Sequence, residues 1–397
     1  MACKESTEWY NIRMISSAGK FNAICYTVMF LLGLWLSVYQ SVISEITDSM
    51  GTGGTFTGIL IALYFFGALT VPPVAGEVSD RFGKKPVLLT AVLVMVIGIA
   101  TVASTGHIVL AGLGVFLTGA GACTLEGLFS AKITDEHAEN SEKIMNYSQG
   151  VFCAGAVLGP MLVLAVRVPG GVWQTSMYII AALMAVAGGA ILCLPGDNKV
   201  PERVKGGAAY SFSLLRDIRF LLFFFSILLY VGAEAGVAFF ITDYFEGSTS
   251  VLGEISLSLF WGSMIIGRLI AGLLYRHSGK IMMICLFTAL VFSLLLQINQ
   301  PPFVSVCLYI LIGLGMSAVW PLIMAACTRT FRSTSGTAGG LMMLGGSLGG
   351  MLIPFVIGII SSTGSVRSAI LLVPAAILVT IILNLPVWRR FTRKKEQ

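Results

Sequence analysis

Two glutamates lie inside long apolar stretches, where a carboxylate has unusual chemistry. Glu126 has no basic residue close to it in sequence, and Glu234 falls near the middle of another apolar stretch. A charged carboxylate is costly to place in such surroundings, so we expect these groups to spend part of their time protonated. Either acid could take up and release a proton, and Glu126 is the stronger candidate. A protonated acid that only hydrogen-bonds a neighbouring helix would show the same pattern.

Two further side chains accompany Glu234. Gln40 occupies the position equivalent to Glu234 at a spacing of 194 residues, and Tyr230 lies one helical turn before Glu234. An acid facing an amide is suited to holding the hydroxyl groups of a polar solute. We therefore predict that Gln40, Tyr230 and Glu234 line a binding cavity, with structural pairing as the alternative.

The same spacing relates Glu126 to an aromatic residue, Trp320. An indole ring stacks on the C–H face of a sugar, although a tryptophan in an apolar helix serves as often for packing. Asn146 and Gln149 are three residues apart on one side of a helix. They could bind solute hydroxyls or equally cap the start of that helix.

Composition places these residues in a membrane protein. Of 397 residues, 56% are hydrophobic and 11% charged, and the mean hydropathy is +0.89. Helices of about 20 apolar residues cross a bilayer, and we find no cleavable signal peptide before the first of them. The sequence predicts twelve such helices, at 21–44, 55–75, 86–105, 107–131, 144–166, 172–194, 218–242, 255–274, 280–297, 303–326, 335–361 and 367–387.

Basic residues indicate the orientation. All but three of the 25 Lys and Arg fall in the termini and in alternate loops. Since basic residues stay on the cytoplasmic side, we predict a multi-pass protein of the cell inner membrane with both termini cytoplasmic. The net charge of +6 is then a topology signal, because no soluble domain exists to gather a nucleic-acid patch.

The second half of the chain repeats the first. Glycines, a lysine and a proline recur at a spacing of 194 to 196 residues across three separate segments. The matched pairs are Gly76 with Gly272, Gly83 with Gly279, Lys84 with Lys280, Gly119 with Gly313, Gly121 with Gly315, Gly155 with Gly349 and Pro160 with Pro354.

This repeat predicts an all-α polytopic fold of two six-helix bundles related by a pseudo-twofold. We expect the N-terminal bundle at 1–194, a cytoplasmic linker at 195–217 and the C-terminal bundle with a basic tail at 218–397. Parallel repeats are the plan of transporters that rock two halves about a midplane site.

Two motifs carry a resemblance to a known family. The sequences Gly76-x-x-x-Asp80-Arg81-x-Gly83-Lys84-Lys85 and Gly155-x-x-x-Gly159-Pro160 resemble the loop signature and part of the fifth-helix motif of the major facilitator superfamily. Three more stretches resemble its branch of fucose, galactose and glucose/mannose proton symporters. They are Gly119-Ala120-Gly121 through Glu126, Tyr230 through Glu234, and Gly315-Met316-Ser317 through Trp320-Pro321.

The sequence departs from that branch in two places. The branch often carries an acid on helix 1 and an asparagine four residues after the helix-4 acid. Here helix 1 has no acid before Glu45, and the later position is Ser130. These departures bear on the identity of the solute and on the number of protons.

The charged turn is expected to act as a gate. We predict that Gly76 and Gly83 let the backbones approach and turn, and that Asp80 and Arg81 lock the cytoplasmic side when the cavity faces outward. The alternative is that this loop only fixes topology. Arg268 lies four residues before Gly272, close enough to the surface to snorkel, and we expect it to join the two bundles rather than bind solute.

The resemblance and the two acids imply a secondary transporter. We expect proton-coupled uptake of a hexose or similar neutral polar solute by a monomer, with lipid around it and with no cofactor beyond the proton, or sodium in its place. The alternative is a drug/proton antiporter; a non-transporting membrane sensor is a third reading. No Walker loop, metal cluster or Ser/His/Asp arrangement is visible in the sequence, so we expect neither an enzyme nor a metal site.

Overall fold

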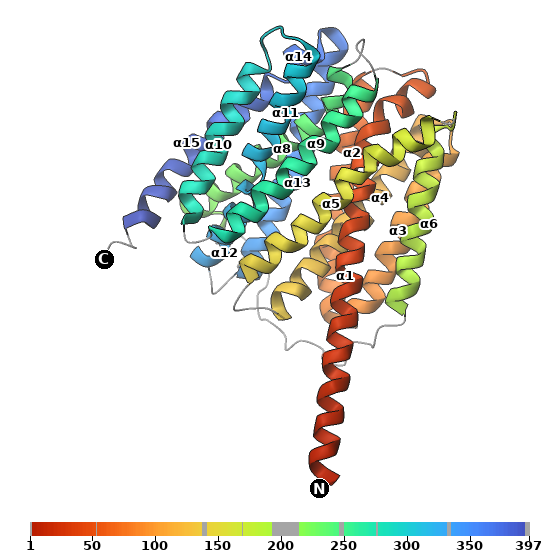
Figure 1. The fold of residues 1–397 in the computed structure, drawn as a ribbon, viewed down its shortest axis with the longest axis vertical. Helices are drawn as coiled ribbons and strands as arrows, with labels where there is room; N and C mark the ends of the chain where they lie inside the picture. Colours follow the sequence, from red (N-terminus) through yellow and green to blue (C-terminus); the bar gives the residue numbers. More distant parts are fainter. Residues whose placement is uncertain are drawn as a thin grey trace.

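The structure is a computed structural model that describes residues 2–52, 54–136, 141–168, 170–192, 214–245, 250–274, 277–331 and 335–393. In this part of the chain all regular structure is helical (Figure 1). The helices are α1 (Ala2–Ser49), α2 (Gly54–Phe82), α3 (Lys84–Ser104), α4 (Ile108–Glu136), α5 (Ser141–Arg167), α6 (Trp173–Leu192), α8 (Ile218–Tyr244), α9 (Ser250–Leu273), α10 (Ser278–Leu295), α11 (Pro302–Met316), α12 (Val319–Thr330), α13 (Ser335–Thr363), α14 (Val366–Ala369) and α15 (Leu372–Arg393).

The predicted spans are confirmed. Among the described residues, twelve helical segments are long and apolar enough to cross a membrane, with α11 and α12 forming one span and α14 and α15 another. An even number of spans places the start of α1 and the end of α15 on one side of the membrane (Figure 1). We call this the terminal side and the opposite one the far side.

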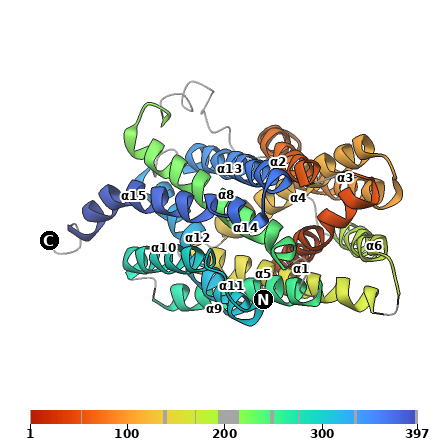
Figure 2. The same cartoon turned by 90° about the horizontal axis from the view of Figure 1, so that it is seen from above.

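The spans form two six-helix bundles, as the repeat predicts. In the first bundle α1 packs on α5, and both α2 and α3 pack on α4; in the second α8 packs on α13 and α15, and α11 on α9 and α10. Two seams join the bundles, one between α2 and α13 and the other between α5 and α9 (Figure 2). Since the repeat relates α2 to α9 and α5 to α13, the pseudo-twofold exchanges the two seams.

Glycines at repeat-related positions allow the tightest helix contacts. A Cβ at Gly155 would lie 1.9 Å from the carbonyl oxygen of Phe30, and one at Gly349 would lie 1.7 Å from that of Leu228. Both distances are far shorter than a van der Waals contact. The atoms that would be met belong to the backbone and cannot rotate away as a side chain could. The close crossings of α1 with α5 and of α8 with α13 therefore require glycine at these two positions.

The contact predicts the effect of Gly155→Ala. We expect the variant to lose stability by about 1–3 kcal/mol or more, because the methyl group must push α1 and α5 apart. Gly150→Ala on the same helix is the matched control, since a Cβ there would meet nothing within 4 Å. Thermal unfolding of both purified variants in one detergent measures the difference. Equal melting temperatures would contradict the close approach.

The charged turn differs from the expectation at one glycine. Helix α2 continues through Phe82, so that Gly76 lies inside the helix, and a Cβ there would meet nothing within 4 Å among the described residues. The close backbone approach predicted at Gly76 is therefore wrong. Gly83 alone makes the turn, with a φ of 88° that favours glycine. The side chains of Asp80 and Arg81 lie outside the described residues, so their gating role stays a prediction.

The tenth span is broken, whereas the sequence predicted one helix over 303–326. Helix α11 ends at Met316, and α12 begins at Val319. Pro321 has no backbone N–H to donate to the carbonyl of Ser317, and its ring would clash with that carbonyl in a continuous helix. The break therefore frees the last carbonyls of α11 for other donors.

The second bundle starts with a capped helix. The carboxylate of Asp217 accepts a hydrogen bond from the backbone N–H of Arg219 at 2.8 Å, which caps the start of α8. The side chain of Arg219 also donates to Asp217 and holds the pKa of that carboxyl below its usual value. The predicted linker at 195–217 falls mostly on residues 193–213, outside the described residues, so the domain boundary stays a prediction.

Candidate functional site

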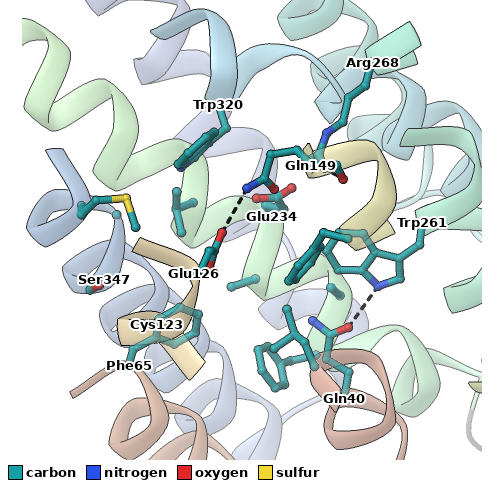
Figure 3. A pocket seen from close by; sticks show the side chains of 18 residues that line it. Gln40, Phe65, Cys123, Glu126, Gln149, Glu234, Trp261, Arg268, Trp320 and Ser347 are labelled. Atoms are coloured by element: carbon teal, nitrogen blue, oxygen red, sulfur yellow. Dashed lines mark hydrogen bonds between the residues drawn. The ribbon is translucent and has the colours of Figure 1, made fainter. Parts of the chain in front are cut away.

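A cavity of about 140 Å³ lies between the two bundles (Figure 3). Helices of both bundles contribute to it, and its wall combines charged, amide and aromatic side chains. The lining residues are Leu36, Gln40, Phe65, Cys123, Glu126, Gln149, Phe152, Val231, Glu234, Ala235, Ala238, Phe239, Trp261, Arg268, Trp320, Met343, Gly346 and Ser347. The cavity thus brings together five of the seven residues that we predicted for coupling or binding, namely Gln40, Glu126, Gln149, Glu234 and Trp320.

Three charged side chains face this cavity. Glu126 comes from α4, Glu234 from α8 and Arg268 from α9. The positive charge of Arg268 acts on both carboxylates, yet no ion pair within 4.0 Å is formed between Arg268 and either one. With both acids ionised, these three groups carry one net negative charge.

Glu126 is held by an amide of its own bundle. The Nε2 of Gln149 donates to Oε1 of Glu126 at 3.1 Å (Figure 3). Gln149 is buried on α5, so it does not merely cap the start of that helix. The side chain of Asn146, predicted beside it, lies outside the described residues.

Arg268 crosses the seam between α5 and α9. It is only 5% exposed, and its Nη1 donates to the carbonyl oxygen of Gln149 and to Sγ of Cys153, both at 2.8 Å. Its Nε donates to the carbonyl oxygen of Ser317 at 3.0 Å. The expected bundle-to-bundle contact is therefore present. The expected snorkelling to the surface is wrong, because the side chain turns inward to these acceptors.

A second contact across the bundles involves Gln40. Nε1 of Trp261 donates to its Oε1 at 3.1 Å (Figure 3). Trp261 was not predicted from the sequence, although it lies seven residues before Arg268 and so shares a helix face with it. Phe65, Phe152 and Phe239 were not predicted either, because they have no polar atom to single them out.

Tyr230 supports the cavity from behind Glu234. The residue is buried and does not line the cavity, contrary to our expectation. Its hydroxyl lies 2.5 Å from the carbonyl oxygen of Met316 and 3.2 Å from Oε1 of Glu234. It therefore links a cavity acid to the break between α11 and α12.

Polar contacts also join the bundles at the far side. Arg167 of α5 bonds Oε1 of Glu254 at 2.9 Å and pairs with Glu45 of α1. Ser44 donates to Asp243 at 2.7 Å, and Thr55 donates to Ser362 at 2.9 Å. We call these seven residues the far-side network. Sequence reasoning missed it because charges near helix ends are common, and nothing in the sequence pairs them.

The sequence of this chain matches a known family. Residues 25–340 and 235–397 match the sequence profile described as Major Facilitator Superfamily. This chain belongs to the major facilitator superfamily. The twelve spans, the two bundles and the cavity between them are thus those of a superfamily transporter.

Solved transporters share the fold. The Escherichia coli fucose:proton symporter FucP superposes with a TM-score of 0.69 at 18% identity, over 91% of this chain and 97% of that one. The nucleoside transporter NupG gives a TM-score of 0.71 at 19% identity, over 91% and 98%. The resemblance to the fucose symporter branch is confirmed at the level of fold.

Relatives by sequence include transporters of other kinds. The uncharacterized MFS-type transporter YfkL of Bacillus subtilis (strain 168) is 21% identical over 358 residues, which cover 86% of this chain and 89% of that protein. The class H tetracycline resistance protein of Pasteurella multocida is 28% identical over 33% of this chain and 32% of its own length. The multidrug resistance protein MdtL of Salmonella typhimurium is 25% identical over 43% of each chain.

Proposed function

We propose that this superfamily transporter couples the uptake of a hexose or similar neutral polar solute to an inward proton gradient by alternating access. Glu126 and Glu234 are the proton-coupling acids, and both line the cavity. Gln40, Gln149 and Trp320 contact the solute, and Tyr230 positions Glu234. The protein acts as a monomer in the cell inner membrane, with both termini on the cytoplasmic side.

The charge of the cavity carries this proposal. Two carboxylates and one arginine leave one net negative charge in a largely buried space, which a single proton neutralises. The amides of Gln40 and Gln149 suit hydroxyl groups, and the rings of Trp261 and Trp320 suit the apolar face of a sugar. The site is therefore matched to a neutral solute that travels with one proton.

Uptake into proteoliposomes tests the proposal. Purified protein is reconstituted and given labelled fucose, galactose, glucose or mannose with an inward proton gradient, an inward sodium gradient or neither. We expect at least one hexose to accumulate under the proton gradient alone, with one proton for each solute. Accumulation driven only by the sodium gradient would contradict the proton as the coupling ion. Failure of every hexose to exchange would contradict the proposed class of solute.

A drug/proton antiporter is the alternative. The matches to the tetracycline and multidrug resistance proteins favour it, and so does the net charge, because a monovalent cation could neutralise the cavity in place of a proton. Ethidium efflux and hexose uptake measured in the same cells separate the two functions. Efflux without uptake would replace our proposal with this one.

The far-side network predicts a conformational effect. We propose that it closes the outward side, so that Arg167→Gln, which leaves the buried Glu254 without its cation, shifts the protein toward the outward-open state by about tenfold. With cavity-lining Cys123 as the single remaining cysteine, impermeant maleimide added from outside should react faster by that factor.

Arg367→Gln is the matched control for Arg167→Gln. Arg367 also lies on the far side, but it donates to Asn299 at 3.0 Å within its own bundle and crosses no seam. Its loss should leave labelling of Cys123 unchanged. Equal acceleration by both variants would contradict a role for Arg167 in closing the outward side.

A further inference from the structure

The hydroxyl of Tyr230 has two partners but only one hydrogen. The nearer partner is the carbonyl oxygen of Met316 at 2.5 Å, which can only accept. Without a hydrogen between them, two buried oxygens at this distance would repel each other. The hydrogen of Tyr230 therefore lies toward Met316.

This assignment determines the state of Glu234. Its Oε1 lies 3.2 Å from the same hydroxyl, whose hydrogen is already committed. While that hydrogen lies on Met316, Glu234 makes a hydrogen bond here by carrying a proton and donating it to the hydroxyl oxygen; an ionised Glu234 would instead accept the hydrogen of Tyr230. By contrast, Glu126 receives an N–H from Gln149 and can remain ionised. The geometry thus points to Glu234 as the acid that holds the proton in this state.

The groups around Glu234 connect it to the helix break. Ionisable or charged groups around it are Arg268 on α9, Glu126 on α4, Cys153 on α5 and Tyr230 on its own helix. Tyr230 and Arg268 are also the donors to the two carbonyls that the break frees, those of Met316 and Ser317. An ionised Glu234 would accept hydrogen bonds only, and would compete for both donors.

We propose that Glu234, Tyr230 and the carbonyl of Met316 form a proton-operated latch on the tenth span. Protonated Glu234 leaves the hydroxyl hydrogen of Tyr230 on Met316 and holds the end of α11. Loss of the proton draws that hydrogen to the carboxylate, and the carbonyl of Met316 loses its donor. The latch rests on the proposed proton coupling for its role in transport, but it acts without a solute.

Hydrogen exchange of the full-length protein in nanodiscs tests the latch without any solute. The readout is amide protection of the segment 311–322, corrected for intrinsic exchange, across a range of pH. In the natural protein we expect protection to fall roughly fivefold as pH rises, the effect of losing one buried hydrogen bond. Glu234→Gln cannot ionise and can still donate to the hydroxyl, so it should stay protected at every pH.

Tyr230→Phe should be poorly protected at every pH, because no hydroxyl remains for Met316. Tyr309→Phe is the matched control, because it removes a buried hydroxyl of the same bundle that has no hydrogen-bond partner among the described residues. It should keep the fall in protection as pH rises. Glu126→Gln should keep the step as well. The proposal is overturned if Glu234→Gln retains the step, or if Tyr230→Phe remains fully protected.

Infrared difference spectroscopy locates the proton directly. The C=O stretch of a protonated carboxyl should be present below the step, absent in Glu234→Gln and retained in Glu126→Gln. A band lost only in Glu126→Gln would overturn the assignment. If no hexose is taken up but the pH-dependent change in amide protection still requires Glu234, the proposed solute is contradicted and the proposed latch is supported.

Discussion

Glu126→Gln is expected to abolish the uphill accumulation of solute under a proton gradient while exchange of labelled for unlabelled solute continues. Glutamine keeps the size of the side chain and can still hydrogen-bond Gln149, but it cannot bind or release a proton. Exchange needs no net proton movement, so it should survive. Uptake and counterflow measured in the same proteoliposomes separate the two activities.

Asp48→Asn is the control for this result. It removes an acid that is exposed at the far end of α1 and should leave both activities as they are. Full proton-driven accumulation in Glu126→Gln would show that this acid does not couple the proton. Loss of exchange together with accumulation would instead indicate that Glu126 is needed to bind the solute.

Removal of Arg268 should have the second large effect. Arg268→Ala leaves two half-buried carboxylates without their cation and two carbonyl oxygens without their donor, and we expect the initial rate of uptake to fall by at least about 100-fold. Arg268→Lys keeps the charge but cannot reach Gln149 and Ser317 together, because its ammonium lacks the planar fork. It should recover only part of the rate.

The rates are compared after normalisation to folded protein, since loss of a buried cation also threatens folding. Arg367→Ala provides the control, because that arginine lies outside the cavity and bonds only within its bundle. Wild-type uptake by Arg268→Ala would mean that the three cavity charges do not act together. A full rate of uptake in Arg268→Lys would show that only the positive charge of Arg268 matters and that its hydrogen bonds do not.

Sequence reasoning found the spans, the repeat and much of the cavity because each leaves a one-dimensional signal. Apolar runs reveal spans, and a charge within a run is costly enough to stand out, as at Glu126 and Glu234. The spacing of the repeat then pointed to Gln40 and Trp320, which carry no charge. These residues were predictable because symmetry transfers position from one bundle to the other.

Direction and pairing could not be predicted in the same way. The distance of Arg268 from the end of its helix follows from the rise per residue, but whether it turns to the surface or to α5 depends on the neighbouring helix. The break after Met316 depends on whether Tyr230 and Arg268 can satisfy the freed carbonyls. The partners of Arg167 lie 87 and more residues away in sequence, and no local pattern connects them.

The glycine crossing at Gly155 has a mechanical consequence. It joins α5 to α1 through bare backbone, so that when the bundles rock these two helices must travel as one piece, while α5 slides against α9. Gln149 belongs to α5 and moves with this helix pair. Its side-chain amide donates to Glu126, and its backbone carbonyl oxygen accepts from Arg268. Gln149 therefore contacts both a cavity acid and the seam between the bundles. We expect it to couple a change in the charge of the cavity to the sliding of α5 against α9.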